Sequence, residues 1–346
     1  MRIPCLVVLT LAAACPLAAQ VSDSAARAIA ERALKASPVI DGHNDLAWAI
    51  RENAAAPGDV AVYDLRHRTP RMTDLDRLRR GMVGGQFWSV YIPGEADDRA
   101  YAANGAVSDR PGYARVQLEQ IDIARRFIAR YPDRLMPAYT AADLRAAIAA
   151  GKVGSILGME GGHAIDNSLG VLRAYYALGV RYMTLTHNVT LDWADAALDT
   201  ARHGGLTPFG REVVREMNRL GMLVDLSHVS PGTMSAALAV SEAPVIFSHS
   251  GARALVDHRR NVPDSILRKV PANGGIVMVP FVTSFVSPAV YAHDTAESQV
   301  VTVLKEQFPS DSAARARGLE TWRVAHPTPP ATLTQVADVV DHVRQI

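Results

Sequence analysis

Hydrophobic residues along the chain fall into short continuous runs that alternate with stretches of helical periodicity. In the helical stretches, such as 112–131 and 210–221, apolar residues recur three and four positions apart, and Gly221 offers a natural helix end. The strand-like runs are apolar nearly throughout, which is typical of parallel strands buried on both faces. We predict seven such strands, at residues 38–41, 86–92, 153–160, 180–187, 222–228, 244–250 and 274–281. This alternation predicts parallel strands joined by helices.

Two α/β architectures fit this order, a (β/α)8 barrel and a doubly wound open sheet. A barrel gathers its functional groups at the C-terminal ends of several strands, whereas an open sheet gathers them at one switch point. Five of the seven predicted strands end in a residue that could bind a metal or a proton: His43 with Asp45, Glu160, His187, His228 and His249. We therefore predict an α/β fold of the (β/α)8 TIM-like barrel type, truncated before its eighth strand.

The residues at these strand ends predict a metal site. His43 and Asp45 are two positions apart, so in an extended chain both side chains point the same way. Imidazole and carboxylate ligands without sulfur suit zinc, with manganese, cobalt or iron as alternatives. Glu160, which precedes Gly161 and Gly162, is the best-placed residue to bridge two ions. The predicted two-metal set is His43, Asp45, Glu160, His228 and His249.

Other polar residues have simpler interpretations. His163, His203 and His258 lie in predicted loops, where we expect them to be solvated. Taken singly, His228 or His249 could equally be a hydrogen-bonded core residue. Ser227 and Ser248 precede these histidines, and we expect neither to be a nucleophile with its own base. Asp225 is expected to orient a ligand histidine or a loop.

Composition places the chain among globular proteins and bounds its partners. The 346 residues carry a formal charge of +1, with 49% hydrophobic and 21% charged residues and no basic stripe, which argues against nucleic-acid binding. Simple division of the length suggests two domains, but α/β barrels commonly reach this size as one.

The N-terminus has the pattern of a secretory signal peptide. Residues 1–19 combine one early Arg, an apolar run and small residues before a cleavage site after Ala19, and they are too short to span a membrane. This predicts an exported protein, periplasmic or extracellular, with one barrel domain over 20–346 and no transmembrane span in the mature chain. Lipoprotein anchoring at Cys15 is disfavoured, because Ala12 stands where Leu is preferred. Cys5 and Cys15 are the only cysteines, so the mature chain has no thiolate ligand.

Several motifs in order resemble the membrane (renal) dipeptidase family of zinc peptidases. The resemblance extends from about residue 34 to the C-terminus. The matching stretches are IDGHNDLAW, GMVGGQFWSVYIP, GMEGGHAI, GVRYMTLTHN, DWADA, GMLVDLSHVS and SHSGARAL followed by RRNVPD.

This resemblance implies a role for each metal-site residue. His43 and Asp45 would hold one zinc ion and His228 and His249 a second, with Glu160 bridging the two, which gives two Zn2+ per chain. The family also suggests a homodimer.

The resemblance further implies a substrate and a reaction. His187 would contact the scissile carbonyl, and Arg260 would bind the C-terminal carboxylate of a dipeptide, with the adjacent Arg259 as the alternative. A planar guanidinium suits a carboxylate. A hydroxide shared by two metal ions would attack the peptide carbonyl, and His187 would help to stabilise the oxyanion.

Two rival interpretations stay open. Other barrel amidohydrolases, such as dihydroorotases and deaminases, usually begin with His-x-His and often bridge their metals with a carboxylated lysine. Here the first strand ends in His43-Asn44-Asp45, and Glu160 is the bridging candidate. The second rival is an inactive truncated barrel or a binding module.

The C-terminal stretch keeps the second rival open. Residues 333–346 predict an amphipathic helix with Leu333, Val336, Val339, Val340 and Val343 on one face. In the family such a helix leads to an eighth strand ending in an aspartate that binds the substrate's amino group. The sequence stops at Ile346, so we expect a fragment that is poorly soluble and weakly active when expressed alone.

Overall fold

The computed structural model describes residues 23–94, 112–329 and 336–346, and the chain divides into two units, Met1–Pro38 and Val39–Ile346. The predicted signal peptide and both cysteines lie outside the described residues. Of the first unit, the structure describes helix α1 (Asp23–Ala36) and the two residues that follow it. None of the described helices combines the length and the apolar character needed to cross a membrane.

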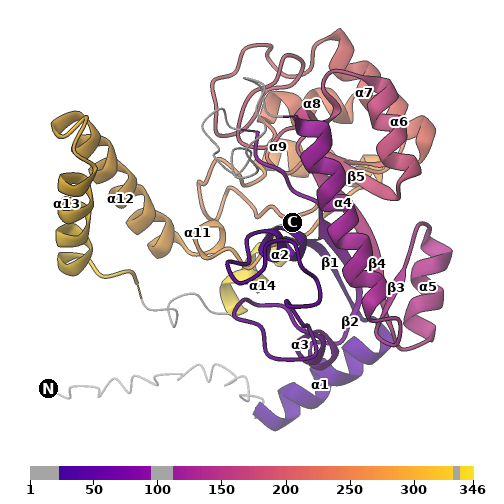
Figure 1. The fold of residues 1–346 in the computed structure, drawn as a ribbon. Coiled ribbons are helices and arrows are strands. Elements are labelled where there is room, and N and C mark those ends of the chain that lie inside the picture. The colour runs from indigo at the N-terminus through magenta and orange to yellow at the C-terminus, as the bar shows by residue number, and fades with distance from the viewer. Residues whose placement is uncertain (1–22, 95–111, 330–335) are drawn as a thin grey trace, which may run out of the picture. The chain divides into compact units, whose positions relative to one another are not determined.

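The second unit is built on one parallel sheet, whose strands are seen as arrows in Figure 1. The sheet has the order β1-β2-β4-β5-β6-β7-β8, and every pairing in it is parallel. The strands are β1 (Val39–Asn44), β2 (Val83–Ser89), β3 (Leu135–Pro137), β4 (Val153–Glu160), β5 (Val180–Thr184), β6 (Leu223–Asp225), β7 (Ile246–Phe247) and β8 (Ile276–Val277). Among the described residues, β1 and β8 are the two edges and do not pair with each other.

All seven predicted strands are present, and β3 is an additional one. β2 pairs with one side of β4. On the other side of β4, β3 pairs with its first half and β5 with its second half. The predictions for the last three strands were too long, because regular pairing covers only three residues in β6 and two in each of β7 and β8. Beyond that, single bonds such as Ser250 N–H to the Met278 carbonyl (3.1 Å) continue the contact.

Helices follow the strands and cover the sheet, as expected for a TIM-like (β/α) barrel. Local sequence explains several of their ends: Thr140 and Asp143 form a capping box, and the 208–220 helix begins with Pro208 after the N-cap Thr207 and ends at Gly221. The helices are α2 (Leu46–Arg51), α3 (Leu75–Arg80), α4 (Tyr113–Arg130), α5 (Ala141–Ala149), η2 (Gly162–Ile165), α6 (Leu169–Ala177), α7 (Pro208–Leu220), α8 (Pro231–Leu238), α9 (Asp264–Leu267), α10 (Val270–Asn273), α11 (Thr283–Val286), α12 (Pro288–Gln307), α13 (Ser312–Ala325) and α14 (Val336–Gln345).

The core has two parts. The larger lies between the sheet and its helices and includes Trp88, Phe127 and Trp193. The smaller joins four strand residues, Phe87, Ile156, Tyr182 and Ile246, with Ala138, which directly follows β3. Here the ring of Tyr182 lies so close to Gly158 that a Cβ at that position would be 2.1 Å from it, so only glycine fits.

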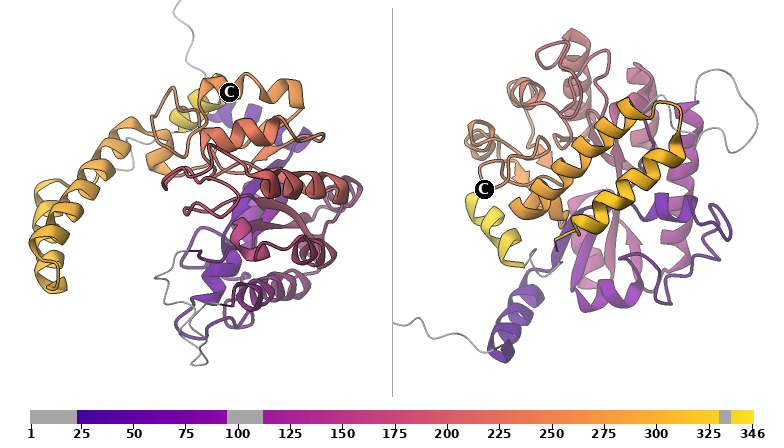
Figure 2. Two further views of the ribbon diagram at one scale, coloured as in Figure 1. Left: turned by 90° about the horizontal axis from the view of Figure 1, so that it is seen from above. Right: turned by 90° about the vertical axis from the view of Figure 1, so that its left-hand side faces the viewer.

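The C-terminal helices lie outside this core. Helices α12 and α13 pack against each other as a hairpin (Figure 2). The predicted C-terminal helix is present as α14, but its predicted apolar face is not what holds it: Val336, Val340 and Val343 are exposed. Instead His342 is buried, and its Nδ1 accepts a hydrogen bond from the Ala252 N–H at 2.8 Å. Leu333 lies outside the described residues.

Candidate metal centre

Side chains from the ends of four strands converge on Glu160, the last residue of β4. Its carboxylate is almost fully buried, with 4% of the residue exposed. Oε1 lies 2.8 Å from His228 Nε2 and 3.4 Å from His249 Nε2, while Oε2 lies 3.4 Å from His43 Nε2. The two oxygens therefore face different histidines, as a bridging ligand requires.

Two groups of ligand-type residues share this glutamate, and within each the ligand atoms lie within 4.8 Å of one another. One group is His43, Glu160 and His249, and the other is Glu160, His187 and His228. Asp45 joins the first group, with Oδ1 3.2 Å from His43 Nε2. The structure thus brings all five predicted ligands together, with His187 beside them. Its grouping places His249 nearer His43, so the predicted partition of ligands between two ions stays a prediction.

Each of the three histidines predicted as metal ligands has a hydrogen-bond partner at its other ring nitrogen. Nδ1 of His43 lies 2.9 Å from the Tyr182 hydroxyl, and Nδ1 of His228 lies 3.1 Å from Asn188 Oδ1. Nδ1 of His249 lies 2.8 Å from the hydroxyl of the preceding serine. These contacts leave Nε2 of every ring facing Glu160, the arrangement found around metal-binding histidines.

His228 reaches this position through an unfavourable backbone conformation. Its φ is 69°, in the left-handed region that non-glycine residues rarely adopt. Such a residue costs about 1–3 kcal/mol and persists only where its surroundings hold it. The Ala197 N–H donates to the His228 carbonyl at 2.7 Å, and Asn188 holds the ring. Strain of this kind at a strand end supports a functional role.

The charge of Glu160 is fixed by its neighbours. Burial alone would raise the pKa of the Glu160 carboxyl, but the charge on His43 and the close contacts of His228 and His249 hold it well below its usual range. Burial would likewise lower the pKa of His43, yet its neighbours, Tyr182 first and then Glu160 and Asp45, raise it well above its usual value. A carboxylate beside an imidazolium results.

The other two histidines are neutral. Burial, followed by the positive charge of Arg260, lowers the pKa of His228 well below its usual value. Burial and the charge on His43 lower the pKa of His249 to about 4. Neutral imidazoles and a carboxylate are the protonation states that bind a metal, and a divalent cation would displace the proton of His43. The donor set therefore fits a cationic centre.

These residues line a cavity of about 1070 Å3 that also contains Arg260. Arg260 is 5% exposed, its guanidinium lies over the Phe285 ring at 5.2 Å, and Nε and Nη2 have no acceptor among the described residues. Burial lowers its pKa to about 10, so it stays charged at neutral pH. Arg259 does not line this cavity and donates to the Asp199 carbonyl at 3.1 Å.

His187 lines the same cavity, with its ring 4.5 Å from that of His228 and 4.9 Å from that of Tyr91.

Two of the three loop histidines are not solvated, contrary to the prediction. His163 is buried, with Nε2 3.1 Å from the Ile92 carbonyl oxygen, because the chain turns sharply at Gly161 (φ 106°) and folds the ring inward. His258 is half-buried between Phe285 and Tyr291, and burial lowers its pKa to about 4. His203 is exposed, as predicted.

Sequence reasoning missed the partners of the histidines. Tyr182 and Asn188 lie on either side of the predicted strand end at 187, so their positions in the motif VRYMTLTHN were the available signal. Ser248 was expected to lack a base, but it does contact His249 Nδ1. Its hydroxyl nevertheless donates to Asp225 Oδ2 at 2.6 Å and is buried, which is unsuited to a nucleophile.

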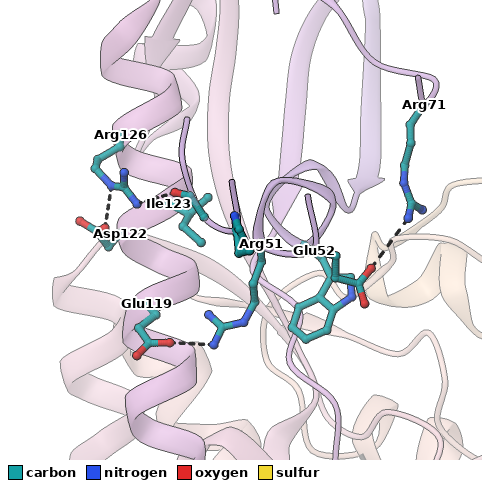
Figure 3. Close-up of a pocket in the computed structure, with 10 residues that line it drawn as sticks. Arg51, Glu52, Arg71, Glu119, Asp122, Ile123 and Arg126 are labelled. Atoms are coloured by element: carbon teal, nitrogen blue, oxygen red, sulfur yellow. Dashed lines mark hydrogen bonds and ion pairs between the residues drawn. The ribbon is translucent and has the colours of Figure 1, made fainter. Parts of the chain in front are cut away.

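A second cavity, of about 710 Å3, lies beside α2 and α4 (Figure 3). It shares Trp48 and Arg71 with the first cavity. Every arginine that lines it is paired with a carboxylate: Arg51 with Glu119 at 2.7 Å, Arg71 with Glu52 at 3.8 Å and Arg126 with Asp122 at 2.7 Å.

Comparisons with known proteins agree with this picture. The family model for membrane dipeptidase, peptidase family M19, matches residues 27–346. Among solved structures, dipeptidase AC, a metallopeptidase of family M19, is 27% identical with a TM-score of 0.62, over 72% of this chain and 74% of that one.

Two more distant structures share the fold. The probable dipeptidase PvdM from Pseudomonas aeruginosa is 22% identical with a TM-score of 0.65, over 80% of this chain and 74% of that one. A metallopeptidase from Rhodobacter sphaeroides, solved with a phosphinate mimic of the dipeptide L-Ala-D-Ala, is 23% identical with a TM-score of 0.64, over 89% and 91%.

Proposed function

Because the chain belongs to the membrane dipeptidase family, peptidase family M19, whose members are metal-dependent peptidases, we propose that it is a zinc-dependent dipeptidase. The observation that carries the proposal is the buried Glu160 carboxylate, whose two oxygens face different histidines at 2.8–3.4 Å. An ion pair between Glu160 and one histidine would need only one of these oxygens. A carboxylate shared by two groups of ligands suits a pair of metal ions.

The proposed centre holds two zinc ions. His43 and Asp45 would bind one ion and His228 and His249 the other, with Glu160 bound to both. Such a pair supplies a hydroxide derived from water and a Lewis acid for the substrate carbonyl. The chain's own contribution is to hold neutral imidazole nitrogens at the centre, through hydrogen bonds to their Nδ1 atoms.

Arg260 would bind the C-terminal carboxylate of the substrate. Its guanidinium is buried, and two of its nitrogens have no acceptor among the described residues, so they have lost their hydrogen bonds to water without replacement. A ligand carboxylate would restore these hydrogen bonds. Arg260 and Glu160 line the same cavity, so a molecule bound to one arginine nitrogen can extend toward the metal centre. His187, whose ring contacts those of Tyr91 and His228, would donate to the oxygen of the carbonyl under attack.

The remaining parts of the proposal concern location and assembly. We propose export through the signal peptide at residues 1–19 and keep the homodimer as a prediction.

Elemental analysis and a dipeptide assay on the purified product of the complete reading frame test the proposal together. We expect two equivalents of zinc per chain and turnover of dipeptides with a free C-terminal carboxylate. Fewer than one equivalent of any transition metal would contradict the metal centre. Two equivalents without turnover of any dipeptide in a broad panel would favour the binding-module interpretation, and turnover of cyclic amides instead would favour another amidohydrolase.

A further inference from the structure

Asp225, at the end of β6, is completely buried and accepts four hydrogen bonds. Its Oδ1 accepts from the N–H groups of Ser227 (3.1 Å) and Ser248 (2.9 Å). Its Oδ2 accepts from the hydroxyls of Thr184 (2.5 Å) and Ser248 (2.6 Å). One carboxylate therefore ties together the ends of β5, β6 and β7, and two of these strand ends lead into His228 and His249.

The Ser248 hydroxyl connects this carboxylate to a metal-site histidine. Ser248 Oγ lies 2.8 Å from His249 Nδ1. A hydroxyl has one proton, and Asp225 Oδ2 at 2.6 Å is a far better acceptor for it than Ser227 Oγ at 3.5 Å. The hydroxyl must then accept from His249, so Nδ1 carries the proton of the neutral ring.

The consequence appears at the other ring nitrogen. With the proton on Nδ1, His249 Nε2 presents a lone pair at the centre, 3.4 Å from Glu160 Oε1. A metal binds only the unprotonated nitrogen, so the opposite tautomer could not serve as a ligand without rearrangement.

We propose that Asp225 is a positioning residue that acts through Ser248 to hold His249 in the tautomer protonated on Nδ1, with Nε2 directed at the metal centre. The proposal rests on the proposed function only for the ligand role of His249. His228 offers an internal comparison, because Asn188 rather than Asp225 contacts its Nδ1.

The substitution Asp225→Asn separates this role from a purely structural one, in which Asp225 only holds the ends of β5, β6 and β7 together. The amide has nearly the same shape, and its oxygen should stay with the two backbone N–H groups, since an NH2 group cannot accept. The NH2 group then faces the Ser248 hydroxyl and donates to it. The hydroxyl proton turns to His249 Nδ1, which leaves the ring proton on Nε2.

Long-range 1H–15N correlation spectra of metal-free protein with 15N-labelled histidine report each tautomer directly. We expect His249 to be protonated on Nδ1 in the wild type and on Nε2 in Asp225→Asn, while His228 keeps its wild-type tautomer in both. Competition with a chromophoric chelator should show zinc binding at least about tenfold weaker for one equivalent, the range found when partners of ligand histidines are removed.

Two further variants complete the test. Ser248→Ala breaks the relay but leaves Asp225 with its backbone donors, so His249 should lose its single tautomer and zinc affinity should fall in the same direction. Thr184→Val is the matched control: it removes the other hydroxyl donor to Oδ2 and should change neither property. If Asp225→Asn does not fold, Ser248→Ala alone decides.

An unchanged His249 tautomer in Asp225→Asn and Ser248→Ala would overturn the proposal and leave Asp225 as a brace between strands. A wild-type protein that binds no zinc would instead contradict the proposed function. The tautomer spectra of the metal-free protein would still decide whether the relay exists.

Discussion

The two cavities that share Trp48 and Arg71 contain similar kinds of residue but differ in how their charges are balanced. In the cavity beside α2 and α4, each arginine has its own carboxylate (Figure 3), and the pairs Arg71–Glu52 and Arg126–Asp122 are largely exposed to solvent. Exposed ion pairs of this kind contribute about 0–1 kcal/mol each. In this cavity every arginine charge is balanced by a neighbouring carboxylate, so none is left to bind a ligand.

The cavity at the strand ends is different, because its charges are buried and are left incompletely paired. Arg260 has two nitrogens without an acceptor among the described residues, and three histidine nitrogens surround one carboxylate. Buried charge without full compensation is costly, so a fold retains it where a ligand completes the set. The contrast teaches that incomplete pairing, more than volume or the presence of charged residues, marks the candidate site.

The largest expected effect comes from Glu160→Gln. The amide keeps the shape but loses the negative charge that both ligand groups share, so both ions should be lost together and each Kd should rise by at least about 100-fold. Metal analysis after dialysis against a weak chelator measures this. Glu119→Gln, in the other cavity, is the control and should retain both ions. Loss of a single ion from Glu160→Gln would show that the carboxylate serves one site only.

Arg260→Ala should have the next largest effect, confined to substrates with a free carboxylate. A charge-assisted hydrogen bond contributes about 1.5–3 kcal/mol, which corresponds to roughly 10- to 150-fold in kcat/KM. C-terminally amidated dipeptides should be affected far less. Arg259→Ala, which removes a neighbouring exposed guanidinium, should behave as the wild type. Equal losses for acids and amides in Arg260→Ala would show that the arginine is structural.

The strand ends could be predicted from the sequence because polar residues there interrupt apolar runs of fixed period. The histidines, Glu160 and the strand order all follow from that local pattern. The short strand β3 escaped prediction because three residues, Leu135–Pro137, give no period to count. Its pairing with β4 is set by tertiary contact.

The partners of the histidines could not be predicted for a similar reason. Asn188 contacts His228 across 40 residues and Tyr182 contacts His43 across 139, so no spacing within one motif relates them. The burial of His163 depends on the backbone turn at Gly161, and the anchoring of α14 depends on one histidine reaching Ala252. Side-chain direction within loops is decided by packing, which periodicity does not describe.

A smaller effect is expected from acid, through His258, whose ring packs against Phe285, a residue that lines the strand-end cavity. Its pKa is lowered to about 4 by burial, together with the charges of Arg260 and Arg253. In the unfolded state His258 therefore becomes protonated as the pH falls through 6.5. In the folded state it becomes protonated only as the pH falls to about 4. Stability from this residue is present above pH 6.5 and is lost as the pH falls to 4, by up to about 2 kcal/mol once solvent screening is allowed for. Urea unfolding of the wild type and His258→Gln at pH 7 and pH 4.5 should show a smaller acid loss in the variant; an equal loss would place the acid sensitivity elsewhere.

The smallest effect is expected in the paired cavity, and it tests the comparison from the other side. Arg126→Ala removes an exposed pair with Asp122 and a hydrogen bond to the Gly58 carbonyl (3.0 Å). Because solvent screens the pair, the free energy of unfolding should fall by no more than about 1 kcal/mol, and less at high salt. Dipeptidase kcat/KM should stay within about twofold of the wild type, since no charge in that cavity is left for a ligand. A large loss of activity, with stability preserved, would mean that the second cavity takes part in substrate binding and that its ion pairs open to admit a ligand.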